Sequence, residues 1–153
     1  MTPITGTVDV ASSPDEVFAY IADPTRRPEW QHSIERIEVD RTSNAGGLGT
    51  RVRETRRVPG RTITATWEVT EFQPGHRFAF RGIDGPVRPV VSMALAPLEG
   101  GERTRVSIEI AFETYGLGKL FGALARRNAS KEVVADGQHL KEALETGTSS
   151  RPS

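Results

Sequence analysis

The sequence contains no cysteine, which excludes disulfide bonds, a thiol nucleophile and thiolate metal ligands. It has no apolar run near the roughly 20 residues that cross a bilayer. Its first residues, Met1 to Ile4, form neither the basic nor the apolar segment of a secretion signal. We therefore expect a cytoplasmic protein with no integral membrane association.

The chain also has a formal net charge of zero, because Lys and Arg together number 20 and Asp and Glu together number 20. No overall field concentrates nucleic acid or an acidic substrate, so we expect no nucleic-acid partner. No catalytic motif occurs, and His32, His76 and His139 lack the spacing of metal ligands. We expect neither a metal nor a cofactor.

Regularly spaced turn signals divide the middle of the chain into β-branched and aromatic runs. With 153 residues the chain is long enough for one domain with a real core. The pattern predicts seven long strands, which should pair in sequence order as a twisted antiparallel meander. They cover 4–10, 34–41, 49–58, 61–73, 76–82, 87–97 and 103–113.

Two short helices are predicted after the first strand. Ser13 is a suitable N-cap, Pro14 suits the first helical position, and Glu16 can complete a capping box. The dipeptide Asp23-Pro24 should end this helix, and one further helical turn is expected between 24 and 30.

A long helix is predicted from about Tyr115 to Glu145, within a domain of residues 1–145 followed by a disordered tail, 146–153. Its apolar stripe changes phase along the helix. We favour a kink around 128–130, and the alternative is that the second half buries a different face. The first half of the stripe contains Leu117, Leu120, Phe121 and Leu124, and Val133, Leu140 and Leu144 fall nearly opposite.

This order of elements resembles the helix-grip fold of the START-like (SRPBCC) superfamily, which includes polyketide cyclase/dehydrase-like proteins. The resemblance rests on segments 13–18, Asp23-Pro24, Pro28-Glu29-Trp30, Gly49-Thr50, 74–77 and 101–106. It implies an α+β fold in which a curved, seven-stranded antiparallel sheet wraps around the long C-terminal helix. It also implies that a hydrophobic or aromatic small molecule, lipid or polyketide-like, binds between sheet and helix.

Strand alternation predicts which side chains face this interior. Most are apolar, so an apolar binding site follows, although each residue alone could equally be core. The candidate ligand-binding residues are Arg56, Trp67, Phe78, Phe80, Val91, Met93, Phe112, Tyr115 and Phe121.

Glu54 and Arg56 share the inward parity of the third strand. There Glu54 could act as a general base and Arg56 could stabilise an enolate. The alternative is an ordinary ion pair at an open rim. His32 is a candidate proton carrier at the cavity mouth, and its alternative is a solvent-facing loop residue.

These observations leave three functions open. The first is a carrier or sensor of a hydrophobic small molecule. The second is a polyketide cyclase or dehydratase acting on a poly-carbonyl substrate, and the third is a protein-interaction domain. The chain is expected to be a monomer or a homodimer.

Overall fold

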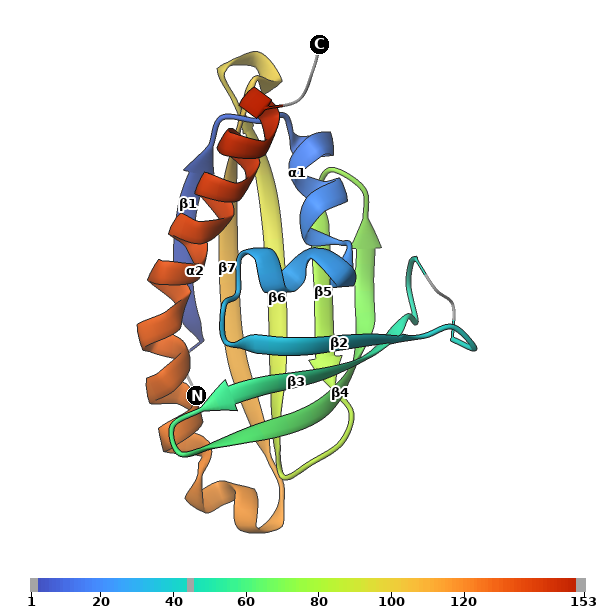
Figure 1. The fold of residues 1–153 in the computed structure, drawn as a ribbon, viewed down its shortest axis with the longest axis vertical. Coiled ribbons are helices and arrows are strands. Elements are labelled where there is room, and N and C mark those ends of the chain that lie inside the picture. The colour runs from blue at the N-terminus through green and yellow to red at the C-terminus, as the bar shows by residue number, and fades with distance from the viewer. Residues whose placement is uncertain (1–2, 44–45, 151–153) are drawn as a thin grey trace.

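The computed structural model describes residues 3–43 and 46–150, with side chains placed up to Thr146. Along the chain, one strand is followed by two short helices, six strands and a long helix, with short 3-10 segments before and after the last strand (Figure 1). The strands are β1 (Ile4–Val10), β2 (Ile34–Asp40), β3 (Arg51–Val58), β4 (Arg61–Gln73), β5 (Arg77–Gly82), β6 (Val87–Leu98) and β7 (Arg103–Thr114). The helices are α1 (Pro14–Ile21), α2 (Gly122–Ser150) and the 3-10 segments η1 (Pro24–Glu29), η2 (Glu99–Gly101) and η3 (Gly116–Leu120).

All seven strands form one sheet in the order β1-β7-β6-β5-β4-β3-β2. β2 to β7 pair with their sequence neighbours in antiparallel fashion, as predicted. The exception is β1, which pairs with β7 rather than with β2, because α1 and η1 carry the chain across the sheet. β1 and β2 therefore form the two edges, and the predicted pairing of β1 with β2 is wrong.

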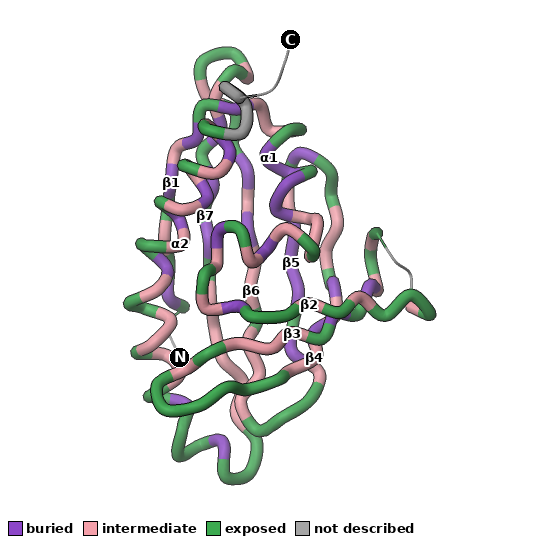
Figure 2. Tube along the Cα trace, in the orientation of Figure 1, coloured by how far each residue is buried: buried purple, intermediate pink, exposed green. Residues whose placement is uncertain are grey.

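The predicted inward parity is confirmed. Trp67 and Phe80 are each only 2% exposed, and Phe78, Met93 and Val106 are buried on the same side. Figure 2 shows buried positions along α1 and β5. This side of the sheet is covered by α1, whose Phe18 ring lies 5.1 Å edge-on from Phe72.

The two short helices begin as their sequences predict. The Ser13 hydroxyl accepts a hydrogen bond from the Glu16 N–H at 3.3 Å, with Pro14 in the first helical position. Asp23 accepts from the Thr25 N–H at 3.0 Å and thereby caps η1. η1 lies over the inner face of the sheet, where its Arg27 guanidinium is 4.8 Å from the Phe80 ring centroid.

α2 continues through 128–130 as one α-helix, so the favoured kink is not observed. Its second half buries Val133, Leu140 and Leu144, whereas the first stripe is exposed. Close packing on β1 requires glycine: a Cβ on Gly6 would lie 2.8 Å from Val133 Cγ2. The phase change therefore marks the point where the helix begins to contact the sheet.

α2 extends to Ser150, beyond the predicted end of the helix, so the first part of the predicted tail is helical. Residues 151–153 of that tail lie outside the described residues. Among the described helices, none is long and apolar enough for a bilayer span.

Candidate functional site

Glu54 lies inward, as predicted, and is held between two arginines. Arg27 Nε is 3.3 Å from Glu54 Oε1, and Arg56 Nε donates to Glu54 Oε2 at 3.1 Å. The Arg27 side chain is 3% exposed and the Glu54 side chain 11%. Buried charges in such a group are retained only with partners, and here each carboxylate oxygen has one.

Gln31 and Trp67 complete what we call the arginine–glutamate cluster (Arg27, Gln31, Glu54, Arg56 and Trp67). Gln31 Oε1 accepts from both guanidinium groups, at 2.8 Å from Arg27 and 2.9 Å from Arg56. Trp67 Nε1 donates to Glu54 at 3.4 Å, and the Arg27 guanidinium lies 5.2 Å from the Trp67 ring centroid. One buried nitrogen, Arg27 Nη1, has no hydrogen-bond partner among the described residues.

The cluster keeps Glu54 ionised. Burial raises the pKa of Glu54, but Arg56 and Arg27 outweigh it and hold the pKa below its ordinary value. A carboxylate stabilised in this way is a weak base, which favours a structural role, balancing the charges of the two arginines, over proton abstraction. Burial also lowers the pKa of Arg27, with Glu54 acting in the opposite direction.

α2 adds two further carboxyl groups beside the cluster. Glu132 Oε2 lies 3.4 Å from Arg56 Nη1, and Asp136 follows one helical turn later. Burial, and then the charge of Glu132, raise the pKa of Asp136 to about 6. Asp136 can therefore exchange a proton near neutral pH.

Asp136→Asn is expected to stabilise the protein by about 1 kcal/mol at pH 7.5, allowing for partial solvent screening. The folded-state pKa of Asp136 is raised, so its ionisation opposes folding increasingly as pH rises from about 4 to about 6. Urea unfolding at pH 4 and 7.5 measures this, and the gain should vanish at pH 4. Asp9→Asn is the control. This substitution removes a favourable ion pair with Arg105, so it should not stabilise the protein at pH 7.5. An equal gain at both pH values would contradict the assignment.

His32 is exposed and stacks on His139 of α2, with ring centroids 3.9 Å apart. Its Nε2 lies 3.3 Å from the Glu29 carbonyl oxygen. The stack joins the end of η1 to α2 at the rim of the cluster. This position is closest to the solvent-facing alternative, and a role for His32 in proton transfer stays a prediction.

An apolar cavity of about 200 Å³ lies on the other side of Trp67. Its mouth is formed by the segment from Asp23 to Thr25 and by Arg41, Gly46 and Gly47. Among the described residues that line it, none belongs to α2, so this cavity lies beneath the end of α1 rather than between sheet and C-terminal helix as expected. Its inner wall is formed by Ala22, Val39, Thr50, Trp67, Val69, Phe72 and Phe78.

The structure brings only part of the predicted ligand-binding set to this cavity. Trp67 and Phe78 line it. Phe80 and Met93 are buried core, and Val91 and Phe112 pack against that core half-buried. Tyr115 and Phe121 are 43% and 51% exposed and lie in another part of the molecule.

Sequence reasoning missed Arg27 and Asp136. Arg27 lies in the polar run Thr25-Arg26-Arg27-Pro28, which is typical of a solvated turn. Asp136 could have been suspected from its spacing of four residues from Glu132, which places both on one helix face. Arg27 has no local signal of burial, because its partners Glu54 and Trp67 come from β3 and β4.

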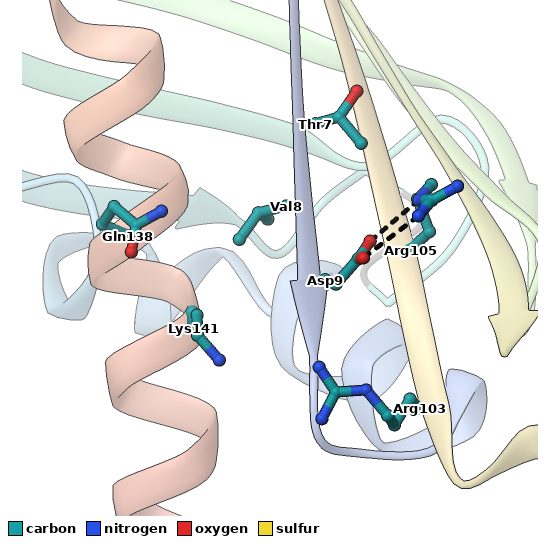
Figure 3. A pocket seen from close by; sticks show the side chains of 7 residues that line it. All are labelled: Thr7, Val8, Asp9, Arg103, Arg105, Gln138 and Lys141. Atoms are coloured by element: carbon teal, nitrogen blue, oxygen red, sulfur yellow. Dashed lines mark hydrogen bonds and ion pairs between the residues drawn. The ribbon is translucent and has the colours of Figure 1, made fainter. Parts of the chain in front are cut away.

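A second hollow, of about 550 Å³, lies between β1 and α2 (Figure 3). At its edge Asp9 of β1 and Arg105 of β7 form a two-point ion pair at 2.8 and 3.1 Å. Arg103 and Lys141 add further charge. This largely polar lining does not suit an apolar ligand.

A family model described as polyketide cyclase/dehydrase and lipid transport matches residues 1–145. The chain belongs to this family. Among curated proteins, none matches significantly. The description of this family names polyketide cyclase/dehydrase activity and lipid transport.

Solved structures show the same helix-grip architecture. A START superfamily protein from Mycobacterium smegmatis is 16% identical with a TM-score of 0.79, covering 95% of this chain and 99% of its own. The Zhui aromatase/cyclase from Streptomyces sp. R1128 is 21% identical with a TM-score of 0.79, covering 95% and 94%. The protein TTHA0849 from Thermus thermophilus is 20% identical with a TM-score of 0.77, covering 95% and 99%. At these identities the likeness establishes the fold.

Proposed function

We propose that this member of the polyketide cyclase/dehydrase and lipid transport family binds a small apolar or aromatic molecule in the cavity beside Trp67, as a carrier or sensor. The observation that carries the proposal is an enclosed apolar cavity whose wall includes Trp67, the ring that also donates to the buried arginine–glutamate cluster. Apolar walls supply affinity and a few polar groups supply orientation.

The size of the cavity limits the ligand class. An apolar cavity of about 150 Å³ accommodates a benzene ring, so about 200 Å³ suits one or two rings or a short acyl segment. Thr25 and Arg41 at the mouth of the cavity can donate hydrogen bonds to a ligand carbonyl or carboxylate oxygen. A ligand with an apolar ring and one such oxygen therefore fits this lining.

2-Naphthol is a suitable probe, and isothermal titration calorimetry should show saturable binding to one site. Val39→Phe places a ring into the cavity and should weaken binding at least tenfold. Val134→Phe makes the same change on the exposed face of α2, where Val134 is 68% exposed, and should leave affinity unchanged. Equal affinity for the two variants would rule out this cavity as the site.

An enzymatic alternative, cyclisation or dehydration of a poly-carbonyl substrate, is favoured by Asp136. Its pKa of about 6 suits proton transfer, and Arg27 and Arg56 could stabilise an enolate nearby. Incubation with a poly-carbonyl aromatic precursor, followed by mass spectrometry for loss of water, distinguishes an enzyme from a carrier. Catalytic roles for Glu54 and His32, a cytoplasmic location and the oligomeric state stay predictions.

A further inference from the structure

η3 and the start of α2 form one end of the molecule (lower end of Figures 1 and 2) and present large apolar side chains to solvent; we call this end the apolar tip. Leu117 and Leu120 in η3 are 75% and 74% exposed. Side chains this apolar normally occur singly on a surface, and a contiguous group marks an interaction site. The tip consists of Tyr115, Leu117, Leu120, Phe121 and Leu124.

Cations accompany these apolar residues. Segment 115–131 contains Lys119, Arg126, Arg127 and Lys131 but no Asp or Glu. Lys119, Arg127 and Lys131 are exposed. In α2 the positions 124, 127 and 131 lie on one helix face, so an apolar side chain and two cations project together.

The acidic residues that flank segment 115–131 in the sequence are paired with residues outside it. Glu113 pairs with Arg81 at 2.6 Å, and Glu132 pairs with Arg56 at 3.4 Å. Asp84, in the loop that holds η3, is accompanied by Arg88, whose guanidinium lies 4.3 Å from the Tyr115 ring centroid. Since the whole chain has no net charge, the rest of the molecule carries the compensating negative charge. The molecule is therefore polarised, with its positive end at the apolar tip.

The tip is anchored to the sheet. The Tyr115 N–H donates to the Pro86 carbonyl oxygen at 2.8 Å. A Cβ on Gly118 would lie 1.9 Å from that same oxygen, so only glycine permits this approach. η3 is thereby held against the start of β6 with its leucines directed outward.

We propose that the apolar tip docks on the surface of an anionic lipid bilayer. Leucines and aromatic rings that project from the end of the molecule can enter the boundary of the acyl chains, while neighbouring Lys and Arg contact anionic headgroups. The polarised charge orients the tip towards such a surface. This docking concerns a different face from the cavity and does not depend on the proposed ligand.

Two other occupants fit less well. A two-fold dimer through the tip would bring the same four cations of 115–131 against their copies, and like charges repel. An acidic protein would satisfy the charge, but it would need a groove shaped for separately projecting leucines. A fluid bilayer needs no such complementary shape.

Co-sedimentation with vesicles tests the proposal. Vesicles of phosphatidylcholine with a quarter phosphatidylserine should bind the protein, and pure phosphatidylcholine should bind it at least tenfold more weakly. The double variant Leu117→Gln/Leu120→Gln should reduce partitioning at least tenfold, as should Lys119→Glu/Arg127→Glu. Leu48→Gln, in the loop after β2, is the control for the leucine variant, and Arg36→Glu, on β2, is the control for the charge variant. Both should bind like the wild type.

Three results would overturn the proposal. They are no binding of the wild type to anionic vesicles, binding that ignores the phosphatidylserine content, or unchanged binding of both double variants. Sedimentation velocity on the same proteins gives a fourth: a dimer that the leucine variant dissociates would assign the tip to self-association instead. 2-Naphthol binding should persist in both double variants, which separates this test from the cavity.

Discussion

Trp67→Ala is expected to lower the free energy of unfolding by about 3 to 5 kcal/mol. The Trp67 side chain is 2% exposed, lies 4.3 Å from the Phe80 ring and donates to Glu54. Removal of the indole ring enlarges the apolar cavity by the space that the ring filled. It also removes the hydrogen bond from Trp67 Nε1 to Glu54. Urea unfolding measures the loss, with fluorescence of the remaining Trp30 as the signal.

Two companion variants separate the causes of the Trp67 effect. Trp67→Phe keeps most of the apolar volume and should lose only about 1 kcal/mol, for the missing N–H donor. Ile63→Ala, on the same strand but 38% exposed, should cost clearly less than Trp67→Ala. A Trp67→Ala loss no larger than that of Ile63→Ala would mean that the indole is not part of the core.

Arg27→Met is expected to cost about 3 kcal/mol, because it removes one partner of a buried ion pair. Glu54 would keep Arg56 but lose its contact with Arg27 at 3.3 Å. Methionine retains much of the packing against Trp67 and Phe80, so the lost charge accounts for most of the effect. Chemical denaturation at neutral pH provides the measurement.

The neighbouring Arg26→Met is the matched control for Arg27. Arg26 is 41% exposed and pairs with Glu29 at 3.6 Å, and exposed pairs of this kind contribute at most about 1 kcal/mol. The double variant Arg27→Met/Glu54→Gln should recover part of the loss, since it also removes the buried charge. If Arg27→Met proved no more destabilising than Arg26→Met, the ion pair between Arg27 and Glu54 would contribute no more to stability than an exposed pair.

The sheet could be predicted from the sequence because its signals are local. Turn residues bound each strand, and β4 begins and ends where the pattern predicts, at Arg61 and Gln73. Alternation then identifies the inner face, on which Trp67 and Phe80 lie. The same rule placed Glu54 and Arg56 inward, where both are found.

The remaining features depend on contacts between distant segments. β1 pairs with β7 because the intervening helices carry the chain across the sheet. Turn residues in the sequence do not predict this crossing. Arg27 is buried through Glu54 of β3 and Trp67 of β4. The spacing of the leucines in η3 is typical of a helix that packs on a core. In the structure, however, α2 contacts the core only from Ala129 and Val133 onward.

The cavity beside Trp67 is tested most directly by calorimetric titration of the wild type with 2-naphthol at several temperatures. Burial of a ring among Val69, Phe72 and Phe78 predicts a stoichiometry of one and a negative heat-capacity change of binding. Val39→Phe should abolish that heat-capacity signal. Absence of saturable binding, or an unchanged signal in Val39→Phe, would contradict the proposal that this cavity holds an apolar ligand.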